Sequence, residues 1–424
     1  MRSATLERRD PLRPAERRRF PLDPLRAVAA MVVVATHVYV NQLRTMAAPT
    51  AGQEQLSHVF EVAADAAVML FFVLSSFVLY LPASRAALAG REPVTWQDML
   101  LRRVVRLLPL YVVVVVVVWA MTNTSLPGNW RDLALHLTMT HVYSDKYIFW
   151  TNGPAWSLAV EFHYYVLMAI VTPLVVRWAG RSPSRRVRIA RVSTFPAALV
   201  VVGVAYLLWA VATQEHGAWH IWFGPLSMAA IFGMGLALAV AVASGVELRH
   251  RAVRGALVVA AVATFGYVAA VRNPYDVQDQ LWRLALGLAA TALIASIVMT
   301  TGAVPRWLVW KPLVSIGLIS YGIYLLHEPV MRFARWSGLL FDGADGLRGL
   351  LAFAGSTAIV LALTVALAKF SYGAIELNAM RILATFEPGA RLRDYYAHTL
   401  DEVDLPPRRV VRPAAASPQP TRAV

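Results

Sequence analysis

Residues 104–122 read VVRLLPLYVVVVVVVWAMT and contain seven consecutive valines, from Val112 to Val118. In water such a run would be typical of a buried β-strand, because valine is branched at Cβ. A lipid-exposed strand would leave its backbone N–H and C=O groups without partners, whereas a helix satisfies them internally. The run is also about as long as a helix that crosses a hydrocarbon core of about 30 Å. The stretch therefore predicts a transmembrane helix.

The composition extends this prediction to the whole chain. Of 424 residues, 58% are hydrophobic and 15% are charged, whereas soluble proteins carry about 45–50% apolar and about 25% charged residues. We expect an all-α polytopic membrane protein with about ten transmembrane helices. The ten apolar runs lie near 24–42, 60–82, 104–122, 155–176, 196–213, 224–244, 255–271, 281–300, 312–331 and 347–369. The lack of cysteine excludes disulfides, thiolate catalysis and Cys-ligated metal sites.

The charge pattern predicts how the chain is oriented. A net charge of +15 would suggest a nucleic-acid partner in a soluble protein. Here 31 of the 40 Lys and Arg residues lie in the two terminal tails and in alternate loops, and eight lie in the other loops and helix ends. The positive-inside rule then places both termini in the cytoplasm and the protein in the cell membrane, without nucleic acid. The strong excess of Arg over Lys is typical of a GC-rich bacterial genome.

The first apolar run contains two ionisable residues, which are costly in a membrane unless they face a packed interior or water. Arg26 and His37 are 11 residues apart, which on a helix is about 20° beyond three turns and about 16 Å along the axis. They share one face, with Arg26 near the cytoplasmic end and His37 in the outer half. Asp23 followed by Pro24 predicts the helix start, with the carboxylate as its cap. Alternatively, Arg26 reaches the headgroups and His37 only packs.

A cluster of arginines begins the third run. Arg103 and Arg106 are three residues apart, and Arg102 and Arg106 four, so their guanidinium groups gather on one side of the helix at the inner mouth. Planar groups with several donors suit phosphate. The alternative interpretation is ordinary positive-inside anchoring of the chain.

Two further segments carry ionisable residues at an outer level. Glu161 and His163 follow Trp156 at the beginning of the fourth run, and His327 lies near the outer end of the ninth. Glu161 and His163 could also be interfacial residues that face headgroups. Estimated depths put His37, Glu161 and His327 at a similar outer level and Arg103 and Arg106 further in, so a site would cross much of the membrane thickness.

Other candidate motifs carry less chemistry. His136 and His141 are five apart, would point to different faces of a helix and make a poor metal pair, and no HExxH motif is present. We expect no metal site. The Gly233-Met234-Gly235 segment lies inside an apolar run instead of after a strand, so it is not a dinucleotide-binding loop.

These segments, in this order, resemble the membrane acyltransferase 3 family over residues 18–370. The matching segments are Arg18-Arg19-Phe20-Pro21-Leu22-Asp23-Pro24-Leu25-Arg26 with His37, Phe71-Phe72-Val73-Leu74-Ser75-Ser76-Phe77, Arg103 and Arg106 before Pro109, Trp156 to Glu161, and Ile319 to His327. Pro24 and Ser76 replace glycines that are usual in the family. Met69 stands where an acidic residue is common, and Glu376 lacks its usual following proline, so we assign catalysis to neither.

The resemblance implies a standalone enzyme that moves an acyl group, often acetyl, from acyl-CoA to a hydroxyl. The acceptor would be a glycan, a lipid-linked sugar or a secondary metabolite. His37 would act as general base, with Glu161 orienting a histidine or stabilising its charged form. Arg103 and Arg106 would bind the phosphates of acyl-CoA, Arg26 would hold a donor phosphate or the helix packing, and His327 is a further candidate.

The expected domain organisation follows from these segments. Residues 1–17 would form a basic cytoplasmic tail, 18–370 the transmembrane acyltransferase domain, and 371–424 a cytoplasmic tail that is partly disordered. The rival function is a transporter or flippase with an intramembrane path of His, Arg and Glu. The Arg-x-x-Arg at one mouth only, and the lack of two matching interrupted runs, argue against it. A non-catalytic sensor or scaffold is a third possibility.

Overall fold

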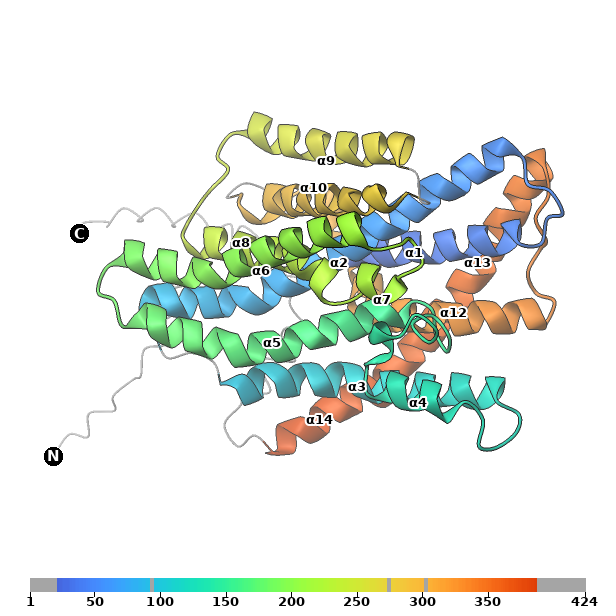
Figure 1. Cartoon of the computed structure of the whole chain (residues 1–424), viewed down its shortest axis with the longest axis horizontal. Coiled ribbons are helices and arrows are strands. Elements are labelled where there is room, and N and C mark those ends of the chain that lie inside the picture. The colour runs from blue at the N-terminus through green and yellow to red at the C-terminus, as the bar shows by residue number, and fades with distance from the viewer. Residues whose placement is uncertain (1–20, 92–94, 273–275, 301–303, 387–424) are drawn as a thin grey trace, which may run out of the picture. The chain divides into compact units, whose positions relative to one another are not determined.

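The computed structural model describes residues 21–386, apart from 92–94, 273–275 and 301–303. Contacts divide the chain into Met1–Leu383 and Ala384–Val424, and the architecture below is that of the first unit. Over the described residues every regular element is helical and none is a strand (Figure 1). The all-α prediction is confirmed. The expected tail 1–17 lies outside the described residues, as does most of 371–424.

In the described part of the chain, nine helical segments are long and apolar enough to cross a membrane, and a bent pair makes up to ten. Each of the ten predicted runs coincides with one of them. They are α1 (Asp23–Leu43), α2 (Ala51–Ala89), α3 (Trp96–Thr122), α5 (Ala155–Gly180), α6 (Arg185–Thr213), α7 (Trp219–Trp222) with α8 (Ala229–Ala243), α9 (Arg251–Val271), α10 (Trp282–Val298), the bent pair α11 (Lys311–Leu318) and α12 (Ser320–Trp336), and α13 (Gly346–Ser371). The bend between α11 and α12 measures 70°.

Two elements differ from the predicted boundaries. A short helix, α4 (Trp130–Leu137), lies in the loop before α5. At the end of α13 a π-helical turn, Tyr372–Glu376, leads into α14 (Leu377–Phe386). Helix therefore continues well past residue 369, where the last apolar run was expected to end.

The valine run forms the second half of α3, as predicted. Val114, Val115 and Val118 are buried, whereas the other four valines are exposed. The buried positions recur three and four residues apart, which is the spacing of one helical face. Because the side chains are identical, the neighbouring helices alone decide which valines face the protein.

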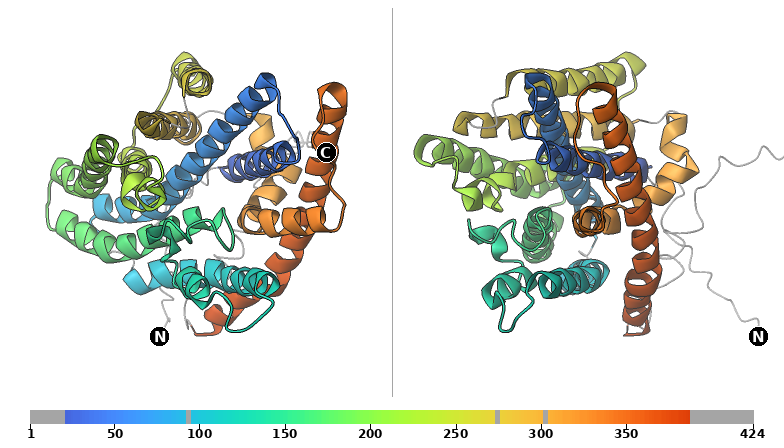
Figure 2. Two further views of the ribbon diagram at one scale, coloured as in Figure 1. Left: turned by 45° about the vertical axis from the view of Figure 1, so that its right-hand side comes forward. Right: turned by 90° about the vertical axis from the view of Figure 1, so that its right-hand side faces the viewer.

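The 39-residue α2 is the central element of the bundle. At a rise of 1.5 Å per residue it is about 58 Å long, well beyond the thickness of a hydrocarbon core. It contacts α1, α5, α8 and α10 (Figures 1 and 2). A Cβ on Gly235 of α8 would lie 2.0 Å from the hydroxyl oxygen of Ser76, so this glycine allows α8 to approach α2 closely.

Two prolines inside helices create contacts between elements. A proline has no N–H, so the carbonyl four residues earlier loses its helical donor. Pro196 frees the carbonyl of Val192 in this way, and the hydroxyl of Tyr80 donates to that oxygen at 2.9 Å. Pro329 frees the carbonyl of Leu325, and a side chain outside α12 donates to it, as described below. Such donors matter because lipid offers none.

Five helices form a closed ring of contacts. α1 contacts α2, α2 contacts α5, α5 contacts α3, α3 contacts α12, and α12 returns to α1. The segments that the sequence singled out lie on these five helices. The fold thus brings residues from both ends of the chain around one interior space.

Candidate active site

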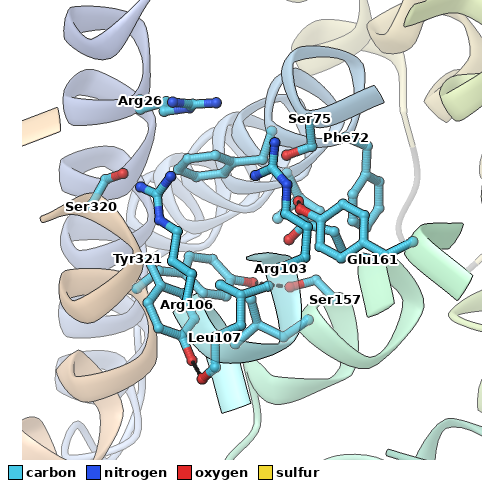
Figure 3. Close-up of a pocket in the computed structure, with 15 residues that line it drawn as sticks. Arg26, Phe72, Ser75, Arg103, Arg106, Leu107, Ser157, Glu161, Ser320 and Tyr321 are labelled. Atoms are coloured by element: carbon cyan, nitrogen blue, oxygen red, sulfur yellow. Dashed lines mark hydrogen bonds between the residues drawn. The ribbon is translucent and has the colours of Figure 1, made fainter. Parts of the chain in front are cut away.

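A partly open cavity lies inside this ring, with about 660 Å³ of empty space that includes its open mouth, and all five helices contribute to its lining. Figure 3 shows that charged and aromatic side chains converge on it. The lining residues are Arg26, Val68, Phe71, Phe72, Ser75, Arg103, Arg106, Leu107, Ser157, Leu158, Glu161, Tyr165, Ser320, Tyr321 and Tyr324. A concave space with a few convergent polar groups is the usual form of a small-molecule site.

Three guanidinium groups enter the cavity. Arg26 comes from the first turn of α1, and Arg103 and Arg106 come from α3 (Figure 3). Arg102 is exposed and does not line the cavity. Of the predicted cluster of three arginines, two therefore line the cavity and one faces outward. Three cations around one space suit a ligand with several negative charges, such as linked phosphates.

The start of α1 differs in detail from the prediction. The helix begins at Asp23 with Pro24 in its first turn, but the N-cap residue is Leu22 and no side chain caps the helix. The carboxylate of Asp23 lies 3.3 Å from Nη1 of Arg26 instead. The predicted capping role of Asp23 is therefore wrong, because the guanidinium one turn later competes for the same carboxylate.

Glu161 lies in the arginine-lined cavity. Its carboxylate accepts a hydrogen bond from the hydroxyl of Tyr165 on the next turn of α5, and Arg103 lies over the ring of Tyr165, 5.3 Å from its centre. The sequence grouped Glu161 with His37 and His327, whereas the structure groups it with the arginines. Its negative charge offsets part of their positive charge.

Sequence reasoning missed the hydroxyl groups of the lining. The hydroxyls of Tyr324 and Ser157 are 2.7 Å apart and join α12 to α5. The hydroxyl of Tyr321 donates to the carbonyl of Leu107 at 2.6 Å and joins α12 to α3. These three hydroxyl groups could have been found from the sequence, because they lie in otherwise apolar runs, within the segments that the sequence analysis singled out.

His37 and His327 meet although they are 290 residues apart. Their ring centres are 4.9 Å apart, and Nε2 of His327 lies 3.3 Å from Nδ1 of His37. His327 is fully buried, and His37 is half-buried. The structure thus brings together two candidates from α1 and α12.

Backbone carbonyls fix the tautomer of each ring. Nδ1 of His37 lies 2.8 Å from the carbonyl oxygen of Val33, and Nδ1 of His327 lies 2.6 Å from that of Tyr324. A carbonyl oxygen only accepts, so both Nδ1 atoms carry the hydrogen. Nε2 of His327, 3.3 Å from Nδ1 of His37, then shares that hydrogen with the carbonyl of Val33. Of the ring nitrogens of the two histidines, only Nε2 of His37 is then left with a lone pair that faces neither ring. This is the atom that a general base would use.

Aromatic rings separate the histidine pair from the cavity. Tyr324 lines the cavity, and its ring centre lies 5.9 Å from that of His327. Phe71 also lines the cavity, and its ring packs edge-on against Tyr324 at 5.8 Å. Neither histidine is among the lining residues. The candidates therefore form two groups, an arginine-lined cavity and a histidine pair, with Tyr324 in contact with both.

The sequence predicted that His136 and His141 point to different faces of a helix, and this prediction is wrong. α4 ends at Leu137, the chain turns, and the two rings stack with centres 4.0 Å apart and planes 8° apart. Both are fully buried, and burial, followed by the nearby His136, lowers the pKa of His141 well below the usual histidine value. Among the described residues no group of three or more His, Cys, Asp or Glu side chains could hold a metal ion.

Comparison with known proteins gives one finding. A family model described as an acyltransferase domain, that of acyltransferase family 3, matches residues 21–369. No curated protein and no solved structure gives a significant match. The matched range contains the cavity and both histidines.

Proposed function

The chain belongs to the acyltransferase 3 family of multi-pass membrane enzymes, and we propose that it transfers an acyl group, namely acetyl, from acyl-CoA to a hydroxyl of a carbohydrate or glycosylated acceptor. The observation that carries this proposal is the arrangement on α1. Arg26 lies in a cavity with two further arginines, and His37, whose Nδ1 is engaged by the carbonyl of Val33 so that Nε2 is left with a lone pair, lies about 16 Å along the same helix.

The cavity supplies the donor site. Acyl-CoA carries several phosphate charges, which the guanidinium groups of Arg26, Arg103 and Arg106 would bind. The long pantetheine arm would then extend past the tyrosines toward the histidine pair. With the termini in the cytoplasm, as the charge pattern predicts, the arginines face the cytoplasmic side, where acyl-CoA is made available.

The histidine pair supplies the base. The acceptor oxygen attacks the thioester carbonyl carbon while Nε2 of His37 takes the hydroxyl proton. The carbon–sulfur bond then breaks, and the CoA sulfur leaves and receives that proton from His37. His327 accepts the Nδ1 hydrogen of His37 throughout and keeps the tautomer that the reaction needs. The products are the acyl ester of the acceptor and free CoA.

Glu161 has a supporting role in this scheme. Its contact with Tyr165, whose ring lies under Arg103, holds the cavity wall and limits the net positive charge. An excess of positive charge would bind the CoA product as tightly as the donor and slow its release. Acceptors of three classes fit the scheme: surface glycans, lipid-linked sugars and hydroxyl-bearing secondary metabolites.

The test uses purified protein in detergent with acetyl-CoA labelled in the acetyl group. We expect the label to become covalently attached to an acceptor from one of the three classes, with release of one CoA for each ester formed. The bent α11–α12 span is the feature that a transporter would also have. Movement of a solute across proteoliposomes with no CoA release and no labelled product would contradict the enzymatic proposal.

A further inference from the structure

The segment just before α5 lies along α12. Between Thr151 and Pro154 its backbone is fastened at two turns of that helix: the hydroxyl of Tyr324 donates to the carbonyl of Pro154 at 3.3 Å, and Nη1 of Arg332 donates to the carbonyl of Thr151 at 3.0 Å. Gly153 lies between these points. A Cβ there would come within 2.8 Å of the Glu328 carboxylate, so the segment is closely fitted to α12.

Between these two contacts lies the carbonyl that Pro329 frees. Nδ2 of Asn152 is 3.0 Å from the carbonyl oxygen of Leu325, and both residues are fully buried. The oxygen can only accept, so the amide nitrogen must face it. Without Asn152 this carbonyl would be buried with no donor from its own helix, because position 329 has no N–H.

The same turn of α12 holds His327. The carbonyl of Tyr324, next to that of Leu325, accepts the Nδ1 hydrogen of His327, and Nε2 of that ring faces His37. A shift of this peptide unit would move both the carbonyl that fixes the tautomer and the ring that faces His37. The position of the histidine pair therefore depends on what holds the backbone at residues 324 and 325.

We propose that Asn152 is a positioning residue for the acyl-transfer step: by donating to the carbonyl that Pro329 frees, it fixes the turn of α12 that presents His327 to His37. This inference rests on the proposed function, in which His37 is the base. Asn152 acts through His327 and has no part in donor binding at the arginines. Its loss affects turnover and leaves the affinity for acyl-CoA unchanged.

The test is a rescue. Asn152→Leu keeps the size of the side chain and removes the donor, and we expect kcat to fall about tenfold, with the KM for acetyl-CoA unchanged. Adding Pro329→Ala restores an N–H at position 329 that can reach the carbonyl of Leu325. The double variant should recover several-fold in kcat over Asn152→Leu. A wild-type kcat in Asn152→Leu, or a double variant no faster than the single one, would overturn the proposal.

A matched control separates positioning from general stability. Tyr80→Phe removes the donor to another carbonyl that a proline frees, that of Val192, in a helix without a site histidine. We expect a lower melting temperature with kcat unchanged. If Tyr80→Phe lowers kcat as much as Asn152→Leu does, the effect is one of stability alone and the proposal fails.

Two measurements keep the inference testable independently of these results. If Asn152→Leu does not yield a monodisperse protein, Asn152→Asp replaces it. The kcat of that variant relative to wild type should rise as the pH falls, because only the protonated acid donates.

If wild-type protein transfers no acetyl group, the proposed function fails, and reactivity of His327 toward diethyl pyrocarbonate then tests the positioning alone. This buried ring should gain reactivity in Asn152→Leu and lose it in the double variant; equal reactivity in all three would refute the inference.

Discussion

The arginine-lined cavity and the histidine pair share α1 and α12 but are built differently. The cavity is partly open, and its charges sit on long side chains. The histidine pair is closely packed, and carbonyls of its own helices fix the hydrogen on each ring. Guanidinium groups can adapt to a ligand through several donors, whereas a base must hold one atom in one place. Under the proposed function, the two regions would divide into binding and chemistry.

This division predicts that mutations in the two regions separate kcat from KM. A residue that acts only in the transition state changes kcat, and a residue that binds the donor equally in both states changes KM. Variants that mix the two effects would show that the regions form a single unit.

His37→Ala should lower kcat by about a thousandfold, because it removes the lone pair that takes the hydroxyl proton. The KM for acetyl-CoA should stay within about twofold, since His37 does not line the cavity. Initial rates at varied acetyl-CoA concentration check this. His163→Ala is the matched control, a half-buried histidine on α5 outside the lining, and should keep the wild-type rate. A normal kcat in His37→Ala would remove it as the base.

Arg103→Ala and Arg106→Ala should each raise the KM for acetyl-CoA by about 10–100-fold, the usual effect of losing a charged hydrogen bond. kcat at saturating donor should change little. Because the interaction is between charges, added salt should raise the KM for acetyl-CoA more in the wild type than in the variants. Arg102→Ala, one residue away and exposed, is the control and should keep the wild-type KM. Equal effects in all three variants would mean that the arginines only anchor the chain in the membrane and do not bind the donor.

Phe71→Ala tests the boundary between the two regions. Removing this ring takes away its contact with Tyr324 and frees space in the cavity wall on the side of the tyrosine that contacts His327. We expect the preference for longer acyl donors over acetyl, as a ratio of kcat/KM values, to rise by about tenfold or more, since space for even one methylene is worth about tenfold. Rates with acetyl-, butyryl- and hexanoyl-CoA give this ratio. An unchanged ratio would mean that the acyl chain takes another route.

A second pair of histidines, His136 and His141, sharpens the comparison because it adjoins no described cavity and should matter for stability alone. Burial lowers the pKa of His141, so the folded protein binds its proton at lower pH than the unfolded chain does. The contribution of His141 to the free energy of unfolding is then constant above about pH 6.5 and falls below it by up to about 1.4 kcal/mol per pH unit. Melting temperatures at pH 7.5 and 5.5 measure this fall.

His141→Phe keeps the stacked ring and removes the titrating group, so it should reduce the dependence of melting temperature on pH. His250→Phe changes an exposed histidine and should leave that dependence as in the wild type. A variant His141→Phe with the wild-type slope would assign the acid sensitivity to other groups.

The transmembrane helices could be predicted because the bilayer imposes one length and one composition on each. The pairing of Arg26 and His37 on one face followed from helical spacing alone. The partners of each side chain could not be predicted, since they depend on tertiary packing: Glu161 joined the arginines, and a turn after Leu137 brought His136 onto His141.

Asn152 illustrates the same limit. Its amide pairs with a carbonyl 173 residues away, and the need for that donor arises only once Pro329 lies within a helix. The proline was visible in the sequence, and so was the missing N–H that it implies. The identity of the group that would replace the N–H was not, because no local pattern connects two such distant segments.

The contact between Phe71 and Tyr324 also bears on the energy supply of the cell. A membrane enzyme that admits a charged donor between its helices is at risk of becoming a leak for protons and ions. Two aromatic rings in the wall of a charged cavity present apolar surface, and apolar constrictions exclude water and with it hydrated ions. The rings would then let a thioester approach while the electrochemical gradient across the membrane is preserved.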